Sequence, residues 1–67
     1  MAGITETGIY AVNGRNYTDN IGNASHMSLI VMHVGFFVNQ FLIFADGSKM
    51  YVRVIWGGAE PSTWKEL

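Results

Sequence analysis

Residues 39–56 read NQFLIFADGSKMYVRVIW and give the clearest secondary-structure signal in the chain. Two runs of β-branched and aromatic residues, which favour strands, flank the dipeptide Asp46-Gly47. Aspartate and glycine tolerate the positive φ angles of a type I′ turn, so the dipeptide predicts a two-residue hairpin loop. With Ala45 opposite Ser48, the register follows along both strands: Ile43 faces Met50, Phe41 faces Val52, and Asn39 faces Val54.

This register divides the hairpin into two faces of different character. One face carries the three pairs just given and is nearly all apolar, so we assign it to the core. We therefore expect Val52→Asp to unfold the domain, because it would bury an unpaired charge. The other face mixes polar and aromatic side chains and is expected to meet solvent or another subunit: it pairs Phe44 with Lys49, Leu42 with Tyr51, and Gln40 with Arg53.

Three more strands are predicted outside the hairpin. Gly8–Val12 reads GIYAV, and Met27–Val34 reads MSLIVMHV, which is apolar on both faces like a central or interface strand. Residues 62–67 follow a glycine-rich reversal and are expected to bring Trp64 back over the open edge of the sheet. The chain is therefore predicted to be a single all-β domain, residues 1–67, built as a small antiparallel β-sheet or sandwich of about five short strands.

The composition limits the classes of partner. At 67 residues the domain buries only about 60% of its unfolded surface, and without cysteine it has no disulfide to compensate. Because 49% of the residues are hydrophobic and 13% are charged, apolar side chains must stay exposed, which predicts oligomerisation or a place in a longer chain. A net charge of −1 with four scattered basic residues argues against nucleic acid. The most apolar window, residues 29–44, is shorter than the ~20 apolar residues of a membrane helix, so no membrane insertion is expected.

Catalytic and metal-binding patterns are weak. The acidic residues fall in predicted turns or near the ends, without pairing. Ser25 and His26 are neighbours, but adjacency does not give triad geometry, so we expect no enzyme. His26 and His33 stand without cysteines or a carboxylate cluster, so neither a metal nor another cofactor is expected. One route to a metal stays open, in which three copies of His33 converge on the axis of a trimer.

The positive functional signal is carbohydrate binding. Sugar sites combine aromatic faces, which pack on C–H surfaces, with short polar side chains that hydrogen-bond hydroxyls. The loop GRNYTDNIGN, residues 14–23, supplies one aromatic ring and several short polar side chains, and long polar loops on small β domains commonly carry function. The candidate glycan site comprises Arg15, Asn16, Tyr17, Asp19, Asn20, Asn23 and Trp56. The alternative is that Tyr17 is a packed aromatic and the Asn and Asp residues only make turns. If Tyr17 and Asp19 bind the ligand, replacing either by alanine is expected to leave the melting temperature unchanged.

The order of several short motifs resembles one known family. The chain reads TGIYAV, a polar loop, SLIVMHVG, a strand containing a glutamine, MYVRV, a glycine turn and STWKEL. From about Thr5 to Leu67, this order resembles the pyocin-knob domain of phage and R-type pyocin tail fibres. The typical positions of that family are occupied here by Thr7, Gly8, Ile9, Tyr10, residues 29–32, Gln40, Tyr51, Arg53, Trp64 and Leu67.

The resemblance implies a non-enzymatic tail-fibre knob that attaches to a bacterial surface polysaccharide. It also implies a homotrimer or a longer fibre chain, found in a virion or bacteriocin particle and made in the bacterial cytoplasm. Two alternatives remain open: a structural domain that trimerises or caps a fibre, and a free-standing accessory protein that decorates one. Exposed rings at Tyr17 or Trp56 would favour receptor binding, whereas burial of those rings at a subunit contact would favour a structural role.

Overall fold

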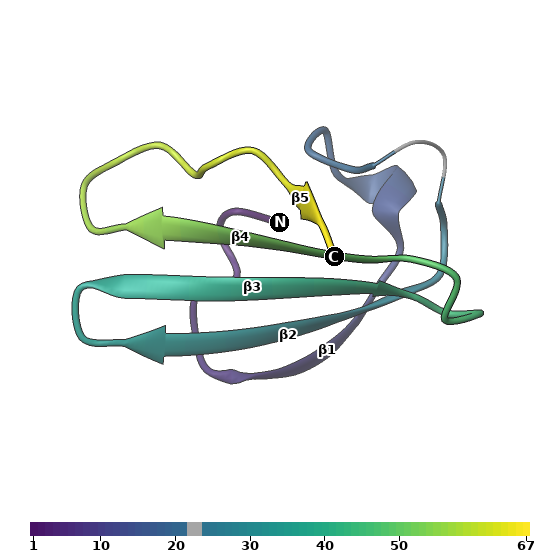
Figure 1. Cartoon of the computed structure of the whole chain (residues 1–67), viewed down its shortest axis with the longest axis horizontal. Helices are drawn as coiled ribbons and strands as arrows, with labels where there is room; N and C mark the ends of the chain where they lie inside the picture. The colour runs from purple at the N-terminus through teal and green to yellow at the C-terminus, as the bar shows by residue number, and fades with distance from the viewer. Residues whose placement is uncertain (22–23) are drawn as a thin grey trace.

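The chain folds into one five-stranded antiparallel sheet in which neighbours in sequence are neighbours in space (Figure 1). The computed structural model describes residues 1–21 and 24–67. The elements are β1 (Gly8–Val12), the 3-10 helix η1 (Gly14–Asn16), β2 (Met27–Val34), β3 (Phe37–Phe44), β4 (Met50–Trp56) and β5 (Lys65–Glu66). The predicted all-β class is confirmed, as are the bounds of β1 and β2. The last strand is shorter than predicted. In the described ranges, no helix has the length and apolar character needed to cross a membrane.

The β2–β3 connection is a tight turn at Gly35 and Phe36. Val34 pairs with Phe37, so two residues form the loop. Gly35 has a φ of 56°, and no residue other than glycine has a positive φ in the described chain. A positive φ at the first loop residue alone is the signature of a type II′ turn, which suits the twist of a hairpin. The turn leaves the ring of Phe36 88% exposed.

The β3–β4 connection differs from the predicted two-residue loop. A type I′ turn requires positive φ at both central residues, whereas here only Gly47 has one, at 74°. The Gly47 N–H donates to the Phe44 carbonyl at 2.8 Å, and the Ser48 N–H donates to the Asp46 carboxylate at 2.9 Å. Asp46 therefore stabilises the loop through its side chain and does not adopt a left-handed backbone. Residues 45–48 form the loop as a result.

The predicted register of this hairpin is confirmed, but the prediction of its buried face is wrong. Ile43 pairs with Met50, Phe41 with Val52 and Asn39 with Val54, as the sequence indicates. Burial falls on the opposite set, Leu42, Tyr51, Gln40 and Arg53, while Met50 is exposed and the other five predicted core residues are half-buried. A polar pair is tolerated in a core when its hydrogen bonds are satisfied. Arg53 donates to Gln40, and both side chains also bond to the segments that cover them. Val52→Asp is consequently no longer expected to unfold the domain.

The core lies on this buried side, which we call the inner face. Three segments cover it: residues 1–4, the loop after η1, and the chain leading into β5, which lies beside the N-terminus (Figure 1). Leu29 and Leu42, cross-strand neighbours at the centre of the sheet, have no exposed surface. The buried hydrophobic residues are Met1, Val12, Met27, Leu29, Val31, Val38, Leu42 and Tyr51. Coil segments therefore supply the second layer of this face.

Candidate functional site

A polar cluster lies within the inner face and is built around Arg53. The guanidinium donates from Nε to Gln40 Oε1 at 2.7 Å and from Nη2 to Asp19 Oδ2 at 2.7 Å. The indole of Trp64 covers it, with the Arg53 Cζ 4.0 Å from the ring centroid. Trp64 Nε1 also donates to the Asp19 carbonyl at 3.0 Å. We call Asp19, Gln40, Arg53 and Trp64 the Arg53 cluster.

The cluster holds the N-terminal segment against the sheet. Gln40 Nε2 donates to the carbonyl of Met1 at 3.0 Å and to that of Ile4 at 2.9 Å. The Met1 amine forms an ion pair with Asp19 Oδ1 at 2.8 Å. Every polar group of Gln40 is thereby used, as burial requires. Trp64 was expected to cover the open edge of the sheet, but its ring stacks on Arg53 because that cation offers a favourable contact for the aromatic face.

Asp19 is a structural residue in this arrangement. Burial raises the pKa of the Asp19 carboxyl, but the hydrogen bonds and charges of the N-terminal amine and Arg53 outweigh that effect, so the pKa lies below its ordinary 3.8. Contrary to the prediction from the sequence, we therefore expect Asp19→Ala to lower the melting temperature. We expect the same of Tyr17→Ala, because Tyr17 is half-buried and packs against the core.

The low pKa of Asp19 predicts a loss of stability in acid. A carboxyl whose pKa is lowered by folding stabilises the native state above its unfolded pKa, and that contribution disappears as the pH falls through the folded value. We expect a constant melting temperature above about pH 5 and a progressive fall below the ordinary 3.8. Asp19→Asn should be less stable at neutral pH and should show a shallower fall. Hydrogen bonds from Ser48 also lower the pKa of Asp46, but Asp46 is present in both proteins and affects both curves equally. Parallel curves of melting temperature against pH would contradict the assignment.

The other candidate glycan residues do not converge on one surface. Arg15 and Asn16 are exposed in η1, whereas Asn20 donates from Nδ2 to the Ala24 carbonyl at 3.0 Å. Asn23 lies outside the described residues. Trp56, 54% exposed, ends β4 on the opposite side of the sheet from Asp19 and Arg53. The loop and Trp56 therefore cannot contact one sugar together.

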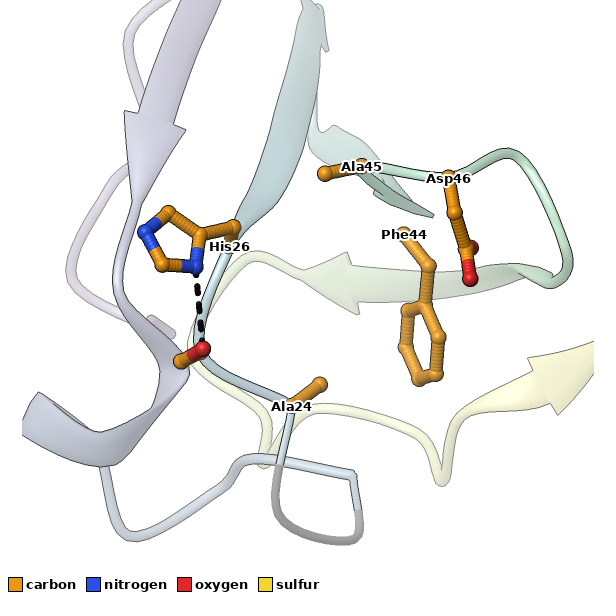
Figure 2. Close-up of a pocket in the computed structure, with 6 residues that line it drawn as sticks. Ala24, His26, Phe44, Ala45 and Asp46 are labelled. Atoms are coloured by element: carbon orange, nitrogen blue, oxygen red, sulfur yellow. Dashed lines mark hydrogen bonds between the residues drawn. The ribbon is translucent and has the colours of Figure 1, made fainter.

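Ser25 and His26 border a shallow pocket between the beginning of β2 and the β3–β4 loop (Figure 2). Ser25 Oγ lies 2.9 Å from His26 Nδ1. The Asp46 carboxylate lies across the pocket from the imidazole and accepts from the Ser48 N–H (Figure 2). In the part of the chain that is described, no carboxylate hydrogen-bonds to His26. The pair thus lacks the acid that orients a catalytic histidine.

His33 lies near the end of β2 and contacts the N-terminal segment. Its Nδ1 lies 3.0 Å from the Thr5 carbonyl, and its N–H donates to Thr7 Oγ1 at 2.9 Å. Its cross-strand neighbour, Val38, belongs to the inner face. Across residues 1–21 and 24–67, no three metal-binding side chains of His, Asp or Glu gather in one place. His33 therefore also lies on the inner face, so copies of the chain that assemble through the other face of the sheet would not bring their His33 side chains together.

The opposite side of the sheet, which we call the outer face, is apolar and uncovered. Cross-strand pairing places these side chains on it: Ile9, Ala11, Ser28, Ile30, Met32, Val34, Phe37, Asn39, Phe41, Ile43, Met50, Val52, Val54, Trp56 and Lys65. Only Ser28, Asn39 and Lys65 are polar, and Lys65 lies on the edge strand β5. Phe37 and Trp56 pack together at one end, with ring centroids 5.2 Å apart. A contiguous apolar surface of this kind is typical of an interaction site.

Comparison with protein-family models, with curated proteins and with solved structures gave no match in any of the three. The resemblance to pyocin-knob domains therefore stays a prediction from the order of motifs.

The outer face was missed in the sequence because it was assigned to the core. The signal that distinguishes the faces is the cross-strand pair of Gln40 and Arg53, two long polar side chains inside otherwise apolar strands. Such a pair can hydrogen-bond internally and hold a covering segment, whereas the pair of Phe41 and Val52 offers only an apolar surface.

Proposed function

We propose that this domain is a non-catalytic assembly module whose contact surface is the outer face. The observation that carries the proposal is a whole sheet face of apolar side chains, with its one charge at the edge, left uncovered in a chain of 67 residues. Exposed residues such as Met32 and Val34, 41% and 50% exposed, would be removed from water by a protein partner. In terms of the pyocin-knob resemblance, this role corresponds to a structural domain that trimerises or caps a fibre.

Attachment to a bacterial surface glycan is the second candidate. It is favoured by the exposed ring of Trp56 beside Phe37, because adjacent aromatic rings can stack on a sugar. It is weakened by the use of Asp19 and Tyr17 inside the fold, which removes polar and aromatic groups from the expected site. The assembly role therefore accounts for more of the surface.

Photo-crosslinking separates the two candidates. We expect benzoylphenylalanine in place of Phe41, on the outer face, to give a protein adduct in the cells that produce the chain, identified by mass spectrometry. The same group in place of Lys49, an exposed residue next to the β3–β4 loop on the other side of the sheet, should give little adduct. A polysaccharide adduct at Phe41 would favour attachment. Absence of any adduct at that position would refute a contact surface there.

A further inference from the structure

We propose that the occupant of the outer face is a second copy of this chain, so that two sheets pack face to face in a homodimer. The inference rests on the proposed function and specifies its partner. Domains are ordinarily built from at least two packed layers, and here coil segments cover only the inner face. A second copy would supply the missing sheet, and the two would form a sandwich with a spacing of ~10 Å.

The area of the outer face is close to the minimum for a biological interface. The longest strands have eight residues, which at a rise of ~3.3 Å span roughly 26 Å. The four strands β1 to β4, spaced ~4.8 Å apart, span roughly 19 Å. The face therefore covers at most roughly 500 Å² per copy, and a pair would bury up to about 1,000 Å², the smallest area expected of a biological interface.

The chemistry of the face favours a copy of itself over an unrelated partner. A partner that presents charges to this surface would leave them buried without counter-ions, which is costly. A second copy presents a surface equally free of charge, and its single Lys65 lies on β5 at the edge, where it can remain in water. Twofold pairing of identical patches is also the commonest form of oligomer among soluble proteins.

Asn39 is a polar group that a twofold axis would satisfy. It is the third of the eight residues of the central strand β3 and lies between Met32 and Val54 on the neighbouring strands. Its carboxamide makes no hydrogen bond to the described residues, although it has both donors and an acceptor. Residues near a twofold axis meet their own copies, so two Asn39 carboxamides can pair with each other. A polar pair of this kind in an apolar interface fixes the register of the two copies, as a buried asparagine does in coiled coils.

Analytical ultracentrifugation of the full chain at micromolar concentration tests the proposal. The parent protein should sediment at twice its mass of 7.4 kDa. Asn39→Asp would bring two carboxylates together near the axis, and we expect its dissociation constant to rise on the order of 100-fold or more. Asn16→Asp makes the same change on the exposed η1 and should leave the dimer intact. Asn39→Leu should retain the dimer, because it removes a polar group from an apolar contact.

Circular dichroism of each variant separates dissociation from unfolding. If Asn39→Asp fails to fold, Met32→Lys tests the same row of the face at a position 41% exposed, and it should also dissociate the dimer. A monomeric or trimeric parent would overturn the proposal, as would a dimer unaffected by either charge, which would point to pairing along the β1 edge. A monomeric parent that crosslinks through Phe41 to another protein would overturn the dimer and leave the proposed function intact.

Discussion

Arg53→Ala is expected to unfold the domain at room temperature. The substitution leaves Asp19 Oδ2 and Gln40 Oε1 without the donor that each accepts from, and it removes the cation beneath Trp64. Removing one partner from a buried, hydrogen-bonded charge pair costs about 3–5 kcal/mol, and the 28% exposure of the Asp19 side chain places the loss at the lower end of that range. A chain of this length has a total free energy of unfolding of roughly 3–10 kcal/mol, so the loss is comparable to the whole. This loss of stability can be measured by thermal melting, with circular dichroism as the signal.

Arg15→Ala is the matched control for this variant. Arg15 lies exposed on η1 and forms no ion pair with the described residues. A surface change of this kind is expected to alter the free energy of unfolding by less than about 0.5 kcal/mol. If Arg53→Ala melts cooperatively within a few degrees of Arg15→Ala, the Arg53 cluster does not hold the covering segments, and the account of the inner face is wrong.

Leu42→Asp is the second variant expected to unfold the chain. Leu42 has no exposed surface and lies between Leu29 and Tyr51 in the centre of the inner face. A carboxylate there would be buried without a partner, and it would either stay protonated at a large cost or expel the covering segments. Far-UV circular dichroism and the spread of amide proton shifts in an NMR spectrum should both show an unfolded chain.

Val52→Asp also replaces an apolar side chain of the sheet by a carboxylate, but on the outer face instead of the inner face. Val52 is half-buried on the outer face, opposite Phe41, so its aspartate can reach water in a single copy of the chain. We expect this variant to keep the sheet and to lose only contacts made through the outer face. Equal loss of structure in Leu42→Asp and Val52→Asp would show that both faces are buried in the isolated chain.

The strands were predictable because turn residues mark their ends. Gly35, placed between two apolar runs, locates the β2–β3 turn, and the Asp46-Gly47 pair fixes the register of β3 and β4 even though the loop conformation differs. The buried face was not predictable from apolar content, since both faces contain large hydrophobic residues. The choice depends on what covers each face, and that information lies in distant segments of the chain.

The candidate site was less predictable for the same reason. A loop rich in Asn, Asp and Tyr is compatible with ligand binding and with internal hydrogen bonding. Asp19 makes an internal hydrogen bond because its partner Arg53, 34 residues further along the chain, lies opposite it in the fold. No local pattern reports a pairing at that distance. The outer face, by contrast, could be inferred as an exposed apolar surface from the composition, but its position could not.

The Arg53 cluster also affects the order in which the chain folds. The hairpins β2–β3 and β3–β4 join neighbouring residues, so they can form early. The contacts that tie Asp19 to Arg53 and Trp64, and Gln40 to the N-terminal segment, join residues 34 to 45 positions apart and must wait for large loops to close. Until then, a half-formed sheet exposes apolar side chains on both faces. We expect refolding yield to fall as protein concentration rises, because such intermediates associate before Arg53 finds its partners.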